Sequence, residues 1–557
     1  MRTHLFWRNF LVILPLALLA IVASLYFFEI PSVGIDDANI TFVYSKHLAA
    51  GEGLVFNIGG ERVEGFSSLS WMLIAAVGYL LSDSPEWLLL AGNAAIVAAA
   101  LAAACAFLQN YLKLEGAPYA ASIVFLLWAF LNPAWVFWNI ASLMETGLYS
   151  ALLLMTVVVL LNSIFDERLT DRQPLLVGLL VSALLITRPD AMAWALALLG
   201  AWFVVLRWRS DAPVWKFLLI PVLLAAVTMS ALTAFRLGYF GYPLPNTYYA
   251  KMSPDRVYNI VQGATYVGGF VVAYPLAGLC VLLSLVAVIL NIVPVMQSLF
   301  YGGAKLTPQR LALFLVSALI LSGVVIAVLM GGDYFGGYRF LQPIWTLLIF
   351  VPLFYWQRFG KSFPVAGIVL AVLLFALPMN KTWFNLRDDT QRMHHQWDLA
   401  ERGRATGHWL EHMFAEAPEL PVLGITAAGG IKMGYRGFVF DLLGLNDTEV
   451  AHHQGDRKGV AAHASFSKEI FWRRPPGIVE PMLCPPEKRV NRLIDPDNFN
   501  HQILKGLPAD DDFNERYRFA AIRPATLPGT MWICGYFDRQ LLDGLEGSER
   551  VSLYLPD

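Results

Sequence analysis

The stretch LVILPLALLAIVASLYFF, Leu11–Phe28, is an uninterrupted apolar run that is long enough to cross a membrane as a helix. It follows Arg2 and Arg8, and no cleavage site of small residues precedes the acidic pair Asp36 and Asp37. These features predict a retained first transmembrane helix and argue against a cleaved signal peptide.

Comparable apolar blocks recur up to about residue 380 and become rare after it. Of the 557 residues, 57% are hydrophobic and 15% are charged, whereas soluble domains have about 45–50% and about 25%. The pattern predicts a polytopic α-helical membrane protein with about 11 transmembrane helices. Beyond the first, spans are expected at residues 88–108, 118–138, 148–165, 175–187, 190–206, 217–235, 263–293, 312–330, 341–356 and 363–379.

Two domains are expected, a membrane domain in residues 1–379 and a small α/β domain in residues 380–557. In the second domain, Phe384–Glu416 is expected to form a helix, and the segments that start at Leu420 and Gly437 are expected to form strands.

The block Leu69–Leu81 is too short to span, so we expect it to lie in the membrane interface within a long first outer loop, residues 29–87. With a cytoplasmic N-terminus, the cytoplasmic segments carry 12 Lys and Arg in 62 residues, and the opposite loops carry 7 in 107. This distribution follows the positive-inside rule and places residues 380–557 outside the cytoplasm.

The net charge limits which partners the chain can have, and the cysteines bear on the compartment of its C-terminal part. The formal net charge is −2 and the basic residues are scattered, so we expect no nucleic-acid partner. Cys484 and Cys534 both lie in the polar C-terminal part, where an oxidising compartment would allow a disulfide. The alternative is two separately buried thiols.

The adjacent carboxylates Asp36 and Asp37 begin the first outer loop. At a membrane surface, desolvation and mutual repulsion favour protonation of one carboxylate of such a pair, which suits a general base or a ligand of a metal or hydroxyl. The alternative is that one of them caps a helix. The sequence does not decide which of the two would be the base.

Two further outer segments carry cations beside residues that shape the backbone. FGYPLPNTYYAKM, Phe240–Met252, has two prolines and Lys251, which could bind a phosphate. GGDYFGGYRFLQP, Gly331–Pro343, has four glycines with Asp333 and Arg339, and an arginine there suits a phosphate. The alternatives are an aromatic belt with a snorkelling lysine for the first segment and a simple ion pair within the second.

Six motifs stand in order along the chain: GIDDANITFVYSKHLAAGEGLVFNIGGERVEGFSSLSW from Gly34, MET from Met144, RPD from Arg188, GYPLPNTYYAK from Gly241, GGDYFGGYRFLQP from Gly331 and DLLGLND from Asp441. Together they resemble the motifs of bacterial GT-C glycosyltransferases. They are similar, more narrowly, to arabinofuranosyltransferases that use polyprenyl-phosphate-linked arabinose, such as the terminal mycobacterial arabinan enzymes and the pilin arabinosyltransferases.

The resemblance implies a multi-pass protein of the bacterial inner membrane that moves D-arabinofuranose from a polyprenyl-phosphate donor to an extracytoplasmic glycan or to a protein such as pilin. Its acid in the first outer loop corresponds to Asp36 or Asp37, and the departing phosphate would meet Lys251, Arg339 and Arg188. Further candidate contacts to donor or acceptor are Glu64, Glu145, Asn246, Tyr248, Tyr249, Asp333, Asp441 and Asp447.

Two other functions are compatible with the sequence. A GT-C enzyme that transfers mannose or another hexose would share the motifs, and a transporter of lipid or polysaccharide would share the spans. Transporters usually carry ionisable groups at the bilayer midplane, whereas the charges here sit at the ends of the apolar blocks. We expect no metal at the His pairs 394–395 and 452–453, although a divalent cation could assist the transfer.

Overall fold

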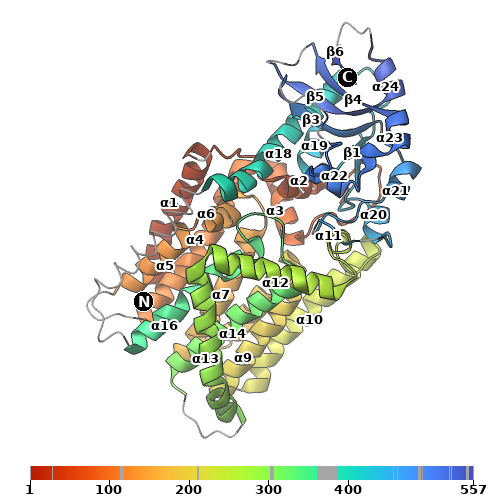
Figure 1. Cartoon of the computed structure of the whole chain (residues 1–557). Helices are drawn as coiled ribbons and strands as arrows, with labels where there is room; N and C mark the ends of the chain where they lie inside the picture. Colours follow the sequence, from red (N-terminus) through yellow and green to blue (C-terminus); the bar gives the residue numbers. More distant parts are fainter. Residues whose placement is uncertain are drawn as a thin grey trace.

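A helical bundle and a unit built on a β-sheet form the two ends of an elongated molecule in the computed structural model of the chain (Figure 1). The structure describes residues 2–27, 29–112, 118–209, 213–300, 306–359, 386–455, 457–460, 462–486, 491, 493–525, 527, 530–546 and 551–555. The expected domain boundary between residues 379 and 380 lies outside these ranges.

Eight helices in the described part of the chain are long and apolar enough to cross a membrane, or nine if a bent pair counts as one span. The chain is therefore a polytopic membrane protein, as predicted. The spanning elements are α1 (Arg2–Phe27), α4 (Glu86–Tyr111), α7 (Thr146–Phe165), α9 (Ala191–Trp208), α10 (Val214–Tyr239), α13 (Pro275–Phe300), α14 (Pro308–Leu329) and the run of η2 (Arg339–Leu341), α15 (Gln342–Leu348) and α16 (Phe350–Phe359).

Two predicted spans have a different form in the structure. Residues 118–138 fold as α5 (Ala120–Phe130), followed after an 80° bend by α6 (Pro133–Val136) and η1 (Phe137–Ala141). The bend lies at Pro133, because a proline disfavours the helical conformation of the residue before it. Residues 175–187 lie in α8 (Arg172–Thr187), which is apolar but shorter than the other spans.

The prediction of one span at residues 263–293 is wrong. The chain forms α12 (Arg256–Ala273), breaks at Tyr274 and continues as α13. Pro275 lacks the N–H that would continue the first helix, and its ring pushes Tyr274 out of the helical region. Figure 1 shows α12 running across the end of the bundle and α13 running along it. The predicted span 363–379 lies outside the described residues.

The first outer loop contains α2 (Asp36–Ala49) and α3 (Leu69–Leu81), and a short helix, α11 (Asn246–Lys251), follows α10. Helix α3 has the bounds of the predicted interfacial block. Its exposed side chains are apolar, as expected of a helix that lies in a membrane interface; they are Leu73, Ile74, Val77, Leu80 and Leu81.

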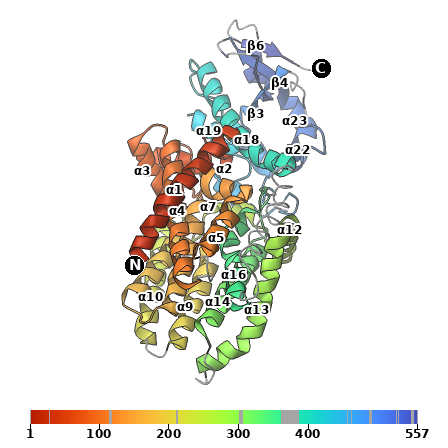
Figure 2. The same cartoon turned by 90° about the vertical axis from the view of Figure 1, so that its left-hand side faces the viewer.

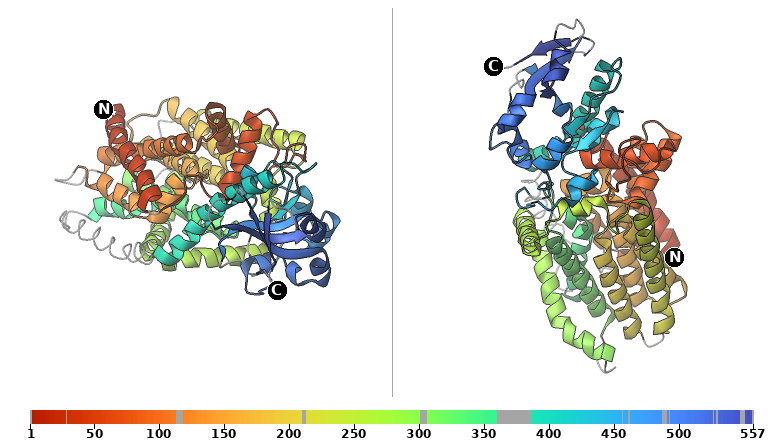
Figure 3. Two further views of the ribbon diagram at one scale, coloured as in Figure 1. Left: turned by 90° about the horizontal axis from the view of Figure 1, so that it is seen from above. Right: turned by 90° about the vertical axis from the view of Figure 1, so that its right-hand side faces the viewer.

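The C-terminal unit is a six-stranded mixed sheet with the strand order β2-β1-β3-β5-β4-β6. Strand β1 pairs in parallel with β2 and β3, and the other ladders are antiparallel. The view from above in Figure 3 shows this unit over one side of the bundle. The strands are β1 (Leu423–Ile425), β2 (Val439–Asp441), β3 (Ile478–Cys484), β4 (Tyr517–Pro524), β5 (Trp532–Asp538) and β6 (Val551–Tyr554).

Helices flank the sheet, and the longest of them, α18 (Leu386–Met413), agrees with the predicted helix. The short helices are α19 (Ala428–Gly434), α20 (Thr448–His452), α21 (Lys468–Arg473), α22 (Phe499–Ile503), η5 (Leu507–Ala509), α23 (Asp511–Arg516) and α24 (Arg539–Asp543).

Tight packing of α19 joins the sheet unit to the first outer loop (Figure 2). A Cβ at Gly429 would lie 1.9 Å from the carbonyl oxygen of Asp36, and a Cβ at Gly430 would lie 2.3 Å from that of Ala400 on α18. Only glycine permits these approaches. A continuous apolar core then includes residues of α2 and of the sheet, so the carboxylates at the start of α2 sit at the junction of the two parts.

Candidate functional site

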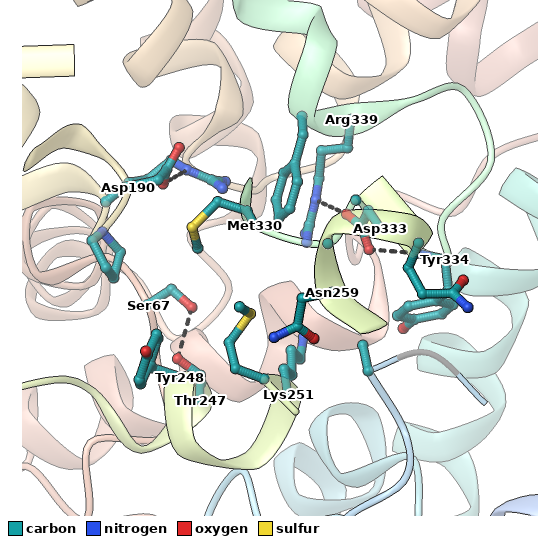
Figure 4. A pocket seen from close by; sticks show the side chains of 18 of the residues that line it. Ser67, Asp190, Thr247, Tyr248, Lys251, Asn259, Met330, Asp333, Tyr334 and Arg339 are labelled. Carbon is teal, nitrogen blue, oxygen red and sulfur yellow. Dashed lines mark hydrogen bonds and ion pairs between the residues drawn. The ribbon is translucent and has the colours of Figure 1, made fainter. Parts of the chain in front are cut away.

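Five of the six motif segments, all except the one from Asp441, line one cavity of about 130 Å³, here called the polar cavity (Figure 4). Four carboxylates and four basic side chains lie in its wall, so an anionic ligand would compete with carboxylates for the cations. These charged residues are Asp37, Glu145, Asp190, Asp333, Arg188, Lys251, Arg339 and Arg457.

Asp37 and Lys251 form an ion pair in this wall, with 3.1 Å between Oδ2 and Nζ. Lys251 is the last residue of α11, which begins after the extended Pro245. Burial would raise the pKa of Asp37, but the charges of Lys251 and Arg339 outweigh it and hold the pKa below its ordinary value of 3.8. Asp37 is therefore ionised at neutral pH.

Asp36 has a different environment from its neighbour. Its carboxylate oxygens accept hydrogen bonds from the N–H groups of Gly429, at 3.1 Å, and Gly430, at 2.7 Å. Burial raises the pKa of Asp36 to about 6 in spite of these bonds. Asp36 thus fastens α19 to α2, while Asp37 faces the polar cavity.

Asp36→Asn is expected to destabilise the fold by about 1–3 kcal/mol, because the amide nitrogen would face a backbone N–H that needs an acceptor. The measurement is hydrogen exchange of the amides of α2 and α19, which reports the free energy of local opening. Asp83→Asn, at an exposed position between α3 and α4, is the control. An Asp36→Asn chain as stable as the control would contradict the fastening role.

Arg188 and Arg339 both pack against the ring of Phe340, with their guanidinium carbons 5.0 Å and 5.6 Å from its centroid. Arg188 binds Glu145 and Asp190, each at 2.8 Å. Arg339 binds Asp333 at 2.7 Å through Nε. This pairing fits the alternative that the sequence left open for Arg339. It still leaves donors, because a guanidinium carries five N–H groups.

Two residues without glycine's freedom hold a left-handed backbone next to these charges. Leu143, with φ 58°, comes shortly before Glu145, and Tyr338, with φ 52°, comes directly before Arg339. Such strained residues concentrate at functional sites. Gly332 has φ 73°, and a Cβ there would lie 2.6 Å from the ring of Tyr266, so the loop needs glycine at this point.

Helix α12 supplies polar lining residues that the sequence analysis did not select. Tyr258, Asn259 and Gln262 face the polar cavity, whereas Val257 and Val261 are exposed. This one-sided pattern was the available signal, and the wrong assignment of a span at residues 263–293 concealed it. Ser67 and Thr247, whose hydroxyls lie 3.2 Å apart, and the predicted Tyr248 complete this wall.

Glu64 and Asn246, which we had expected to contact donor or acceptor, lie outside the polar cavity. Glu64 forms a buried two-point ion pair with Arg236, whose Nε lies 2.8 Å from Oε2. The side chain of Asn246 donates to the carbonyls of Gly444 and Leu445. Both residues hold the outer loops in place.

Three more expected contact residues also have structural partners. Asp441 is buried and accepts from the N–H groups of Leu443 and Asn446. Asp447 caps α20 at Val450 and binds Arg474. The ring of Tyr249 packs against Tyr242 and His452.

A second, larger cavity of about 820 Å³ lies between α2, α18 and the sheet, and is called the large cavity below. Asp37, Lys251 and Tyr334 line both cavities. A group bound in the polar cavity and another bound in the large cavity would therefore both be near Asp37.

Cys484 on β3 and Cys534 on β5 form a disulfide in the wall of the large cavity, with Cα atoms 5.9 Å apart. Cys105 and Cys280 are buried thiols in bundle helices. Among the described residues, no three His, Cys, Asp or Glu side chains are grouped to hold a metal ion.

No family model matches the chain. The chain is similar to a terminal beta-(1->2)-arabinofuranosyltransferase of Corynebacterium glutamicum, with 29% identity over 335 residues. The match covers 56% of this chain and 47% of that protein, so the chain spans about half the length of this relative. The similarity agrees with the resemblance that the motifs indicated.

Proposed function

We propose that the chain is a membrane glycosyltransferase that moves D-arabinofuranose from a polyprenyl-phosphate donor to an extracytoplasmic acceptor. The observation that carries the proposal is the position of Asp37. An ionised carboxylate lies where the cation-lined polar cavity meets the large cavity. The similarity to an arabinofuranosyltransferase supports the choice of sugar.

Asp37 is the general base in this proposal. An oxygen of an acceptor hydroxyl bonds to the anomeric carbon of the arabinofuranose, and the bond from that carbon to the phosphate oxygen breaks. Polyprenyl phosphate leaves, and the hydroxyl proton passes to the Asp37 carboxylate. Charge grows on the phosphate as it departs, so cations placed beside it stabilise the transition state.

Lys251 is the leading contact for that phosphate, because its side chain is more exposed than that of either arginine. Arg188 and Arg339 would add donors from the opposite wall, while Asp190 and Asp333 hold their guanidinium groups in place. The apolar outer faces of the bundle suit a polyprenyl chain that reaches the cavity from the lipid.

The distribution of Lys and Arg supports an orientation in the inner membrane that has a cytoplasmic N-terminus and places both cavities outside the cytoplasm. The predicted cytoplasmic segments are the richer in Lys and Arg. The donor is then a lipid and needs no nucleotide on that side of the membrane.

The test is transfer by the purified chain from synthetic polyprenyl-phosphoryl arabinofuranose, with the mannose donor in a parallel reaction and a chelator in a third. Transfer of arabinose well above that of mannose supports the proposal. Transfer of mannose alone favours the hexosyl alternative. Movement of an intact lipid across vesicles without release of polyprenyl phosphate favours a transporter.

Lys251→Ala is expected to raise the Kd for polyprenyl-phosphoryl arabinofuranose by about 10- to 100-fold, because hydrogen bonds to a charged group contribute about 1.5–3 kcal/mol. Donor binding to the detergent-solubilised chain is the measurement. Lys46→Ala removes an exposed lysine from α2 and serves as the control. Equal donor affinity in both variants would contradict the phosphate contact.

A further inference from the structure

Strand β3 is irregular where it borders the large cavity. Its pairing with β5 shifts register between Val479 and Met482, and Glu480 within this bulge has φ 51°. A bulge re-aims a side chain, and a left-handed backbone at a residue other than glycine costs about 1–3 kcal/mol. The fold therefore maintains an unfavourable backbone to place one carboxyl group.

The carboxyl group of Glu480 lies in the wall of the large cavity, held by three hydrogen bonds. Oε1 accepts from the N–H of Thr426 at 2.6 Å, and Oε2 accepts from the Thr426 hydroxyl and from Nδ2 of Asn500, each at 3.1 Å. Burial raises the pKa of Glu480 to about 7. At neutral pH the group can accept a hydrogen bond and, when protonated, also donate one.

An aromatic side chain and the candidate base also line the large cavity. The ring of Phe499, at the start of α22, is 49% exposed and lines the large cavity. It lies 5.5 Å from the ring of His463. Asp37 also lines this cavity, so a molecule held by Glu480 and Phe499 shares the space that the base faces.

We propose that the large cavity is the acceptor site and holds a glycan, with Glu480 and Asn500 bonding to sugar hydroxyls and Phe499 packing on the apolar face of a ring. The identification of this ligand as the acceptor rests on the proposed function. The prediction that the ligand carries several hydroxyl groups rests on the residues that line the cavity. Carboxyl, amide and hydroxyl groups match alternating donors and acceptors, and the volume is that of a small-molecule site.

A polypeptide acceptor fits this wall less well. Peptides commonly bind by adding a strand to a free sheet edge. Strand β3 is interior, between β1 and β5, and the N–H of Leu483, beyond the bulge, already donates to Thr406 on α18. Recognition in the large cavity therefore depends on side chains.

The test measures binding to the full chain in detergent, without donor, by ligand-observed NMR. The probes are a synthetic arabinofuranosyl disaccharide and a Ser/Thr-containing peptide. Glu480→Gln is expected to weaken disaccharide binding at least about tenfold. Phe499→Ala, a truncation at an exposed position that should not disturb folding, is expected to weaken it about fivefold or more. Glu411→Gln, a carboxylate paired with Arg436 outside the cavity, is the control.

Binding of polyprenyl-phosphoryl arabinofuranose should stay within about twofold of wild type in both cavity variants, because neither residue lines the polar cavity. Unchanged disaccharide binding in both variants would overturn the inference, as would peptide binding that depends on Glu480. If the chain binds the disaccharide through Glu480 but never transfers arabinose, the proposed function is refuted, while the assignment of the large cavity as a glycan-binding site stands.

Discussion

Replacing Asp37 with Asn is expected to slow arabinofuranosyl transfer by about 10²- to 10⁴-fold while the chain still folds, because the variant removes a general base and keeps the shape of the side chain. Asp37 is partly exposed to both cavities, and its ion pair with Lys251 lies at a cavity wall. Asn keeps an acceptor oxygen for the Lys251 ammonium, so the variant leaves no hydrogen-bonding group of this pair without a partner. The initial rate at saturating donor is the measurement.

The pH profile separates Asp37 from Asp36 as the base. The pKa of Asp37 lies below 3.8, whereas that of Asp36 lies at about 6. With Asp37 as the base, kcat/KM for the donor should stay level from neutral pH to about pH 5 and fall only near the pKa of Asp37. The profile is taken at saturating acceptor, so that titration of Glu480 in the acceptor site does not contribute. A fall centred near pH 6, or full activity of Asp37→Asn, would assign the base elsewhere.

Burial of the Asp36 carboxyl group gives the stability of the fold the opposite dependence on pH. The folded-state pKa of Asp36 is raised above its ordinary value of 3.8, so folding favours the protonated form. The stabilisation is fully present below about pH 4 and is lost as pH rises through 6. A rate loss in acid therefore cannot be attributed to unfolding driven by protonation of Asp36.

Sequence patterns predicted the features of this fold that depend on neighbours along the chain. The apolar runs gave the spanning helices, and the short block Leu69–Leu81 gave α3 with its observed bounds. Hydrophobicity alone predicted one continuous helix at each of two places where a proline, Pro133 or Pro275, bends or breaks the helix. Five of the six motif segments also contribute residues to one cavity, and the segment from Asp441 does not.

The roles of individual carboxylates depend on partners distant in sequence, which no local pattern shows. The environments of Asp36 and Asp37 differ because the N–H groups of Gly429 and Gly430 donate hydrogen bonds to Asp36 alone. Glu64 forms an ion pair with Arg236, and the Asp441 carboxylate accepts a hydrogen bond from the turn that follows it. Glu480 belongs to none of the motifs, and its position in the wall of the large cavity depends on a bulge in the pairing of β3 with β5.

Removing the disulfide by Cys484→Ser is expected to destabilise the C-terminal sheet by about 4 kcal/mol. The two cysteines are separated by 50 residues, and closing a loop of that length restricts the unfolded chain by about this amount. Hydrogen exchange at β3 and β5 is the measurement, because it reports local opening where a large membrane protein has no single unfolding transition. Cys280→Ala, a buried thiol in α13, is the control and should leave exchange in these strands unchanged.

The same bond bears on the compartment and on the acceptor site. A stable disulfide needs an oxidising compartment, so blocked thiols at positions 484 and 534 in protein prepared without reductant would support an extracytoplasmic sheet. Both cysteines line the large cavity, and the bond ties β3 to β5 beside the bulge that places Glu480. Reduction should therefore weaken binding of the arabinofuranosyl disaccharide before it weakens donor binding. Two freely alkylated thiols in unreduced protein would contradict the bond and would weaken the proposed orientation.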